Sequence, residues 1–114
     1  MSVIRDVHLV ENLENLLTDQ AAWSQETFGS DEVRGPLGAA KHLCKEAEEL
    51  RDALGTETDL EELADCQLLL WDIARRSGYT FQQLLEACKL KMGINKARTW
   101  PKPINDEPVE HVRT

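Results

Sequence analysis

Hydrophobic residues recur every three to four positions along most of this chain, which is the period of an amphipathic helix. Leucines at this spacing predict a first helix over residues 6–22, with Trp23–Gly29 as its exit or a short extension. A second helix is predicted from Pro36, a residue suited to the first helical position, to about Leu54.

A third helix is predicted by two overlapping start signals and a clear stop. Thr58 with Glu61, or Asp59 with Glu62, fits a capping box, and Gly78 is a good residue for the helix C-terminus. Its apolar residues point nearly all the way round: Leu63, Cys66, Leu68, Leu69, Leu70, Trp71 and Ile73. Such a helix is usually buried on most sides, in a core or a subunit interface.

A fourth helix should begin at Thr80, with Gln83 as its capping partner, and continue to about Gly93 or beyond. Pro101 and Pro103 stop any helix. Four helices with short connections and no convincing strand predict an all-α fold, a four-helix bundle. A bundle with so apolar a third helix has more apolar surface than it can hide alone, so we expect a homo-oligomer.

Length and composition are those of one soluble domain. The chain has 114 residues, of which 41% are hydrophobic and 30% charged. We expect a domain over 1–103 and a C-terminal tail over 104–114. The three cysteines include no C-x-x-C pair, so we expect small buried residues in a reducing compartment rather than disulfides or a zinc site. Neither a signal-peptide layout nor a membrane-length apolar run is present, which indicates the cytoplasm.

The net charge is −8, from 13 basic and 21 acidic residues. This balance argues against general binding of nucleic acid or anionic membranes, because both depend on basic residues that neutralise phosphates. The basic residues are unevenly spread, since five lie between 89 and 102 with no acidic one among them. Lys91, Asn95 and Arg98 share a face if the fourth helix continues, and Lys and Arg are common phosphate ligands. The alternative to phosphate binding is that these basic residues only stabilise the C-terminus of the helix through its dipole.

The acidic residues carry the second candidate for chemistry. Glu46 and Glu49 are three apart on the second predicted helix, beside its apolar stripe, and Glu62 and Asp65 repeat the spacing on the third. In one interpretation they pair with Arg or Lys across the bundle or lie at a wet edge. In the other, the four carboxylates hold Mg²⁺ or Mn²⁺, which prefer oxygen ligands and phosphate co-ligands. Asp52 is a runner-up ligand to Glu49.

These residues resemble a known pattern. Residues 45–50 and 61–65 are similar to the E-E-x-x-E … E-x-x-D motif of the all-α nucleoside triphosphate pyrophosphohydrolases, the MazG-like superfamily, with Lys45 in place of the first Glu. A narrower resemblance, to phage and bacterial dATP/dGTP diphosphohydrolases including the MazZ enzymes, covers most of the chain. It rests on Trp23-Ser24…Thr27-Phe28-Gly29, Arg34-Gly35, His42-Leu43…Lys45-Glu46, Glu61-Glu62-Leu63-Ala64-Asp65, Lys91…Asn95…Arg98…Trp100-Pro101 and Pro108-Val109-Glu110-His111-Val112-Arg113.

The resemblance implies hydrolysis of a purine dNTP (dGTP or dATP, with GTP open) to the monophosphate and pyrophosphate, with Mg²⁺ or Mn²⁺, in a dimer or dimer of dimers. It makes Glu46, Glu49, Glu62 and Asp65 metal ligands and gives phosphate contacts to Lys91, Asn95 and Arg98. Trp23 and His42 become candidates for contact with the base. We hypothesise that Glu49 accepts the proton of the attacking water.

Two other functions stay open at this point. A non-catalytic acidic helical interaction protein would explain the apolar third helix and the net charge, though not the paired carboxylates or the basic face. The other alternative is the same chemistry on pyrimidine dNTPs. The identity of the purine, the use of ribonucleotides and the number of metal ions are not readable from the residues.

Overall fold

A computed structural model of the chain describes residues 7–113. Over this range it contains four helices and no strand: α1 (Val7–Phe28), α2 (Leu37–Ala53), α3 (Asp59–Arg76) and α4 (Phe81–Ala97). The all-α prediction is therefore confirmed for the described part. Residues up to Phe81 form one compact unit and residues from Gln82 onward form a second. The expected domain limit at 103 stays a prediction.

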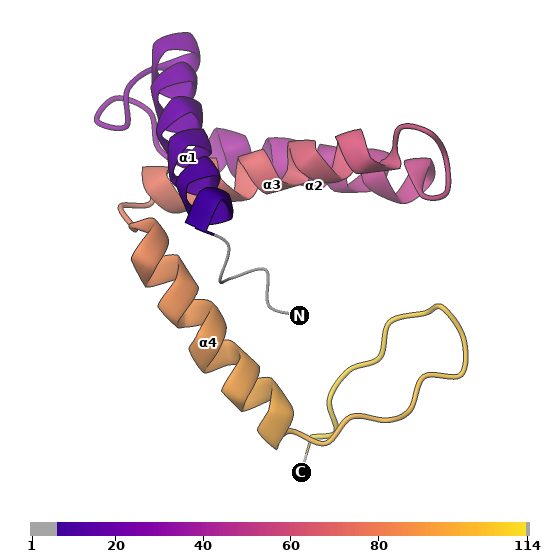
Figure 1. The fold of residues 1–114 in the computed structure, drawn as a ribbon. Coiled ribbons are helices and arrows are strands. Elements are labelled where there is room, and N and C mark those ends of the chain that lie inside the picture. Colours follow the sequence, from indigo (N-terminus) through magenta and orange to yellow (C-terminus); the bar gives the residue numbers. More distant parts are fainter. Residues whose placement is uncertain (1–6, 114) are drawn as a thin grey trace. The chain divides into compact units, whose positions relative to one another are not determined.

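The first unit is built on α2 and α3, which lie side by side, with α1 running across α3 (Figure 1). The α2–α3 connection is a tight turn that places Gly55 at φ +81°, a conformation that side chains disfavour. Thr56 Oγ1 donates to the Ala53 carbonyl (2.6 Å), and Gly55 N–H donates to the Asp59 carboxylate (3.2 Å). These bonds hold the ends of the two helices together.

The helix starts differ from the sequence prediction in detail. Pro36 lies one residue before α2, as its N-cap, rather than at the first helical position. Thr58 is the N-cap of α3 but its side chain forms no capping bond. The Thr58 hydroxyl instead lies 3.2 Å from the Thr56 hydroxyl, and the Asp59 carboxylate accepts a hydrogen bond from the Gly55 N–H. The two capping boxes predicted for α3 are therefore wrong, because the side chains of Thr58 and Asp59 bond within the α2–α3 turn instead.

Helix α1 includes residues 23–28, so this segment is the short extension rather than the exit, and the packed face of the helix changes character along its length. Leu13 and Leu17 are half-buried, and the same face continues through Gln20 and Ser24, which are both buried. The helix ends only at Gly29, which has φ +112° and whose N–H bonds to the Gln25 carbonyl. The apolar stripe thus becomes polar where it meets the C-terminal half of α3.

Few apolar side chains are buried within one copy of the chain. Among the described residues, only Ala39 and Cys66 are buried hydrophobics. The expectation that α3 is buried on most sides is not met in the single chain, where Leu63 and Leu70 are exposed. The expectation of three buried cysteines is also wrong, because Cys44 and Cys88 are exposed. A helix pair and one crossing helix offer too little surface to enclose these positions.

The second unit consists of α4 and an ordered return of the tail. Helix α4 continues past Gly93 to Ala97, and the Trp100 indole N–H donates to the Asn95 carbonyl (2.8 Å). The Val112 N–H donates to the Thr99 carbonyl (2.6 Å), and His111 packs edge-on against Trp100. Across residues 7–113, the helices are too short or too polar to cross a membrane.

Candidate active site

Three carboxylates meet between α2 and α3. One oxygen each from Glu46, Glu49 and Glu62 lies within 4.8 Å of the other two. Glu46 and Glu49 are one turn apart on α2, so both face the same flank of the neighbouring helix. Glu46 and Glu62 are half-buried and Glu49 is exposed. Three of the four predicted metal ligands are thus brought together.

Asp65, the fourth predicted ligand, lies beside this cluster. It is one turn after Glu62 on α3 and lines the same pocket as Glu46. Its charge helps to raise the pKa of Glu62. An aspartate side chain is one carbon shorter than a glutamate, which places its carboxylate further from the three glutamate oxygens.

The cluster carries crowded negative charge. Burial raises the pKa of Glu62, and the charges of Glu46 and Asp65 raise it further. The Glu49 carboxyl hydrogen-bonds to Glu46, which lowers the pKa of Glu46 and raises that of Glu49. These opposed shifts are those of two carboxyl groups that share a site.

These acids have no lysine or arginine partner among the described residues of the first unit. Within residues 7–81, no Lys or Arg forms an ion pair with any of the four predicted ligands. One oxygen each of Glu46 and Glu62 is buried without a hydrogen-bond partner. Buried polar atoms of native proteins are rarely left unpartnered. Oxygen donors at this spacing, with unused lone pairs, fit a hard divalent cation.

His42 contacts the cluster directly. Its Nε2 lies 2.9 Å from Glu46 Oε1, one helical turn along α2. The sequence suggested contact with a base, and the structure gives this ring a partner among the carboxylates as well. A histidine that holds a metal-ligating carboxylate fixes the orientation of that ligand.

A pocket of about 330 Å³ adjoins the carboxylates. Trp23 and Phe28, from the end of α1, form an edge-to-face aromatic pair on its wall, with centroids 5.4 Å apart. Its remaining lining residues come from all three helices: Gln20, Ser24, His42, Glu46, Asp65, Leu68, Leu69 and Asp72. The volume lies within the range of small-molecule sites. Trp23, 57% exposed, is thus available to a ligand.

The far wall of this pocket is a buried polar network that the sequence analysis missed. Asp72 accepts hydrogen bonds from Gln20 Nε2 (3.1 Å), Arg75 and Arg76 Nε (3.0 Å). Burial raises the pKa of Asp72, but hydrogen bonds to the carboxylate lower it by more, and the bond from Ser24 is the strongest of them. The resulting pKa is about 2. This carboxylate is therefore ionised and fully partnered.

Arg76 is the centre of that network. Its side chain is 1% exposed, and it donates to the carbonyls of Gly29 (3.0 Å), Arg34 (3.1 Å) and Ser24 (3.2 Å). It thus ties the α1–α2 loop to α3. The signal in the sequence was Asp72 and Arg76 four apart on a largely apolar helix.

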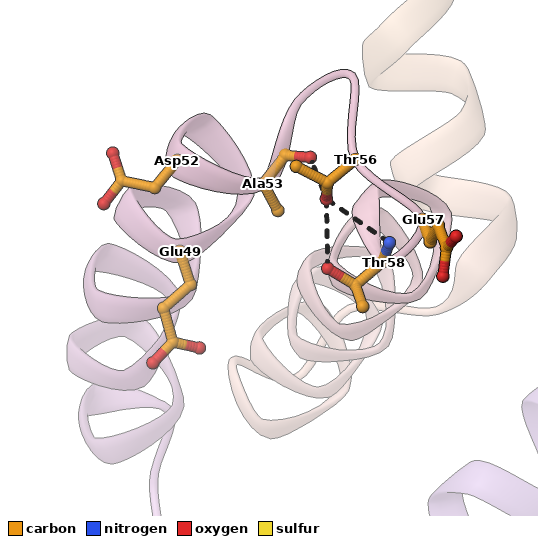
Figure 2. A pocket seen from close by; sticks show the side chains of 6 residues that line it. All are labelled: Glu49, Asp52, Ala53, Thr56, Glu57 and Thr58. Atoms are coloured by element: carbon orange, nitrogen blue, oxygen red, sulfur yellow. Dashed lines mark hydrogen bonds between the residues drawn. The ribbon is translucent and has the colours of Figure 1, made fainter.

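A second, shallow depression of about 600 Å³ lies at the α2–α3 turn, with Glu49 on its rim (Figure 2). Asp52, the runner-up ligand, also lines it, but its carboxylate is directed away from that of Glu49 (Figure 2). Asp52 is paired with Arg51 at 3.3 Å. Asp52 is accordingly outside the three-carboxylate cluster.

Lys91, Asn95 and Arg98 belong to the second unit. The first two lie on α4 and Arg98 follows it, with its N–H donating to the Asn95 carbonyl. Their contact with phosphates stays a prediction.

The matches with known proteins include a family model, a phage protein and a solved structure. The model of the dATP/dGTP pyrophosphohydrolase family matches residues 16–114. The Eaa protein of Salmonella phage P22 is 41% identical over 104 residues, which are 91% of this chain but 31% of that protein. The chain therefore spans about a third of the length of this relative.

The solved structure of a cyanophage S-2L MazG-like pyrophosphohydrolase, bound to dGDP and three catalytic Mn²⁺ ions per active site, superposes with a TM-score of 0.68. It is 29% identical and covers 89% of this chain and 93% of its own. Its ions have the chemistry that the Glu46, Glu49 and Glu62 oxygens would accept. The chain belongs to the dATP/dGTP pyrophosphohydrolase family, among the MazG-like nucleotide pyrophosphohydrolases.

Proposed function

We propose that this protein is a divalent-metal-dependent diphosphohydrolase that converts a purine dNTP to the monophosphate and pyrophosphate. The observation that carries the proposal is the cluster of Glu46, Glu49 and Glu62, with two buried, partnerless oxygens, beside a pocket walled by aromatic rings. Family membership supports the reaction class, and the dGDP in the cyanophage enzyme supports a purine.

Each part of the site has a task in this reaction. Glu46, Glu49, Glu62 and Asp65 would hold Mg²⁺ or Mn²⁺. Such ions, when bound, neutralise phosphate charge and make a water a better nucleophile. The pocket beside Trp23 receives the nucleoside, while Lys91, Asn95 and Arg98 stabilise the phosphates of the substrate. Glu49, the exposed member of the cluster, accepts the proton of the attacking water.

Product analysis tests the reaction class. The purified protein is incubated with Mg²⁺, and then with Mn²⁺, and each of the eight common NTPs and dNTPs. We expect monophosphate and pyrophosphate from dGTP or dATP. Diphosphate and phosphate would reject attack at the α-phosphorus, and turnover of pyrimidine dNTPs alone would reject the purine. No turnover would favour the non-catalytic interaction protein.

The role of Glu49 has a separate test. Glu49→Gln should lower kcat far more than it raises the dissociation constant of the nucleotide, because the amide cannot accept a proton. Glu48→Gln, an exposed neighbour on α2, is the matched control. Normal turnover in Glu49→Gln with normal metal binding would contradict the assignment.

We further propose that the active form is a homodimer or a dimer of dimers. The support is apolar surface that one copy leaves exposed on α3, namely Leu60, Leu63 and Leu70, at 72%, 53% and 45%. An oligomer would bury such residues. Light scattering during size-exclusion chromatography measures the mass, and a 12.9 kDa species at micromolar concentration would contradict the proposal.

Because the proposed substrate is a DNA precursor, we place the reaction in the cytoplasm.

A further inference from the structure

The active-site pocket continues into a small cavity of about 60 Å³ at the start of α2. The two spaces share Phe28, His42, Leu69 and Asp72. The small cavity adds Arg34, Gly38 and Ala39, which the larger pocket lacks. Gly38, His42 and Glu46 follow one another at intervals of four residues on α2, so Gly38 lies about 12 Å along the helix from Glu46.

Arg34 is an unpaired cation at this end of the pocket. Its guanidinium lies over the Phe28 ring, 5.9 Å from the centroid, and against Gly38. Among residues 7–113, no carboxylate forms an ion pair with it and no side-chain hydrogen bond satisfies its N–H groups. A guanidinium has five donors in a rigid plane. Because Arg34 is exposed, these donors are open to a ligand.

The backbone of Arg34 is held firmly even though its side chain is not. Its carbonyl accepts a hydrogen bond from the buried Arg76 (3.1 Å), and its N–H donates to the Ser30 carbonyl (2.9 Å). The loop therefore presents the guanidinium at a defined point without using its donors. Such an arrangement is suited to recognition of a ligand with two adjacent acceptors.

The position of Arg34 favours a base over a phosphate as that ligand. Phosphates belong at the carboxylate end of the pocket, where a divalent cation would hold them. The aromatic pair Trp23 and Phe28 and the ring of His42 lie on the walls between the two ends. The part of a purine nucleotide that reaches furthest from its phosphates is the base.

We propose that Arg34 recognises the base, by donating two hydrogen bonds to O6 and N7 of guanine. Arginine forms this bidentate pair with guanine, whereas adenine presents an amino group at the position of O6. The chain therefore hydrolyses dGTP in preference to dATP. This inference rests on the proposed function and adds to it the residue that selects the substrate.

Substitution of Gly38 is a second way to displace the guanidinium of Arg34. A Cβ built at this position would lie 2.6 Å from Arg34 Nη2, the flexible end of the side chain. Gly38→Ala should therefore displace the guanidinium, while an alanine inside a helix favours the folded state. Loss of selectivity in this variant cannot be attributed to unfolding.

The experiment compares kcat/KM for dGTP and dATP in the wild type, Arg34→Ala, Gly38→Ala and the double variant. Lys41→Ala, which removes an exposed cation of α2, is the matched control. Arg34→Ala keeps the carbonyl that Arg76 binds and should fold normally. We expect kcat/KM for dGTP to fall about tenfold or more, with dATP changed less than about twofold. Gly38→Ala should lose the same preference, and the double variant should lose no more.

Equal losses with both purines, or no change in the ratio, would overturn the inference, since Arg34 would then bind a phosphate or nothing. Calorimetric titration with dGMP and dAMP separates this result from failure of the proposed reaction. If no triphosphate is hydrolysed but Arg34→Ala weakens dGMP binding selectively, base recognition stands and the hydrolase assignment falls. Unchanged dGMP binding would remove base recognition whatever the activity.

Discussion

Helix α3 carries acidic residues of two kinds at its two ends. Near its start, Glu62 joins Glu46 and Glu49, and two of their oxygens are buried without partners. Near its end, Asp72 is buried and accepts hydrogen bonds from Gln20 of α1 and from Arg76 of α3 itself. Their pKa values accordingly move in opposite directions: burial and neighbouring charge raise that of Glu62, while hydrogen bonds outweigh burial and lower that of Asp72 to about 2.

This difference in hydrogen bonding distinguishes an acid that supports the fold from acids that can bind a ligand. A carboxylate whose oxygens are all bonded has nothing left to offer a ligand, so Asp72 fixes the pocket wall. A group of carboxylates that repel one another is incomplete by itself and gains stability when a cation arrives. Substitutions at the two ends should therefore have different readouts.

The largest effect is expected from Arg76→Ala. Truncation leaves Asp72 buried with one charge partner fewer and frees the carbonyls of Gly29 and Arg34. Breaking a buried pair in this way costs about 3–5 kcal/mol. Urea unfolding measures the loss. Arg51→Ala, which removes an ion pair with side chains 71% and 74% exposed, should cost less than about 1 kcal/mol. Similar costs for both would contradict a supporting role for the network.

Glu62→Gln should show the reverse pattern. Turnover should fall at least about 100-fold, because loss of a ligand exceeds the 10- to 100-fold cost of losing an outer partner. The stability of the metal-free protein should be unchanged or higher, since one of the repelling charges is gone. Steady-state kinetics and melting in EDTA measure the two quantities, with Glu48→Gln as control. A destabilised but active variant would place Glu62 with Asp72 as a structural acid.

Addition of Mn²⁺ should stabilise the wild type by about 2.7 kcal/mol at a hundredfold excess over the dissociation constant. The gain should vanish in Glu62→Gln and persist in Asp72→Asn, although the latter starts from a lower melting temperature. Melting curves with and without EDTA provide the comparison. Retention of the full gain in Glu62→Gln would show that Mn²⁺ binds elsewhere.

The smallest expected effect is a dependence on acid. The folded-state pKa of Asp72, about 2, lies below the ordinary 3.8, so ionised Asp72 stabilises the fold above about pH 4. This contribution, about 2 kcal/mol, is lost as the pH falls through 2. The difference in unfolding free energy between wild type and Asp72→Asn should therefore shrink between pH 5 and pH 2. A constant difference would mean that the charge of Asp72 contributes nothing.

Residue spacing was enough to predict that the carboxylates of the site form a cluster. Glu46 with Glu49, and Glu62 one helix later, are predictable as a cluster because residues three apart share a face and a short turn makes neighbouring helices antiparallel. Trp23 was found from resemblance and does line the pocket. The sequence did not decide whether residues 23–28 extend the first helix, because its packed face becomes polar at Gln20 and Ser24. These two residues are explained only by their hydrogen bonds to Asp72 and Arg76 on α3.

Arg34 shows what sequence reasoning does not reach. The resemblance to known enzymes includes Arg34-Gly35 but assigns Arg34 no role. Its importance follows from Gly38, which leaves room for the guanidinium, and from Arg76, which holds the loop from 42 positions away. Contacts of this kind depend on how helices meet, and hydrophobic periodicity does not encode them.

The five-residue turn between α2 and α3 also has a consequence for folding kinetics. It closes a very short loop, and contacts between residues near in sequence form faster than distant ones. We expect the α2–α3 hairpin to assemble before α1 docks through residues more than 50 positions away. If the repelling carboxylates of α2 and α3 meet in that early step, a divalent cation present during refolding should raise the folding rate as well as stabilise the folded protein.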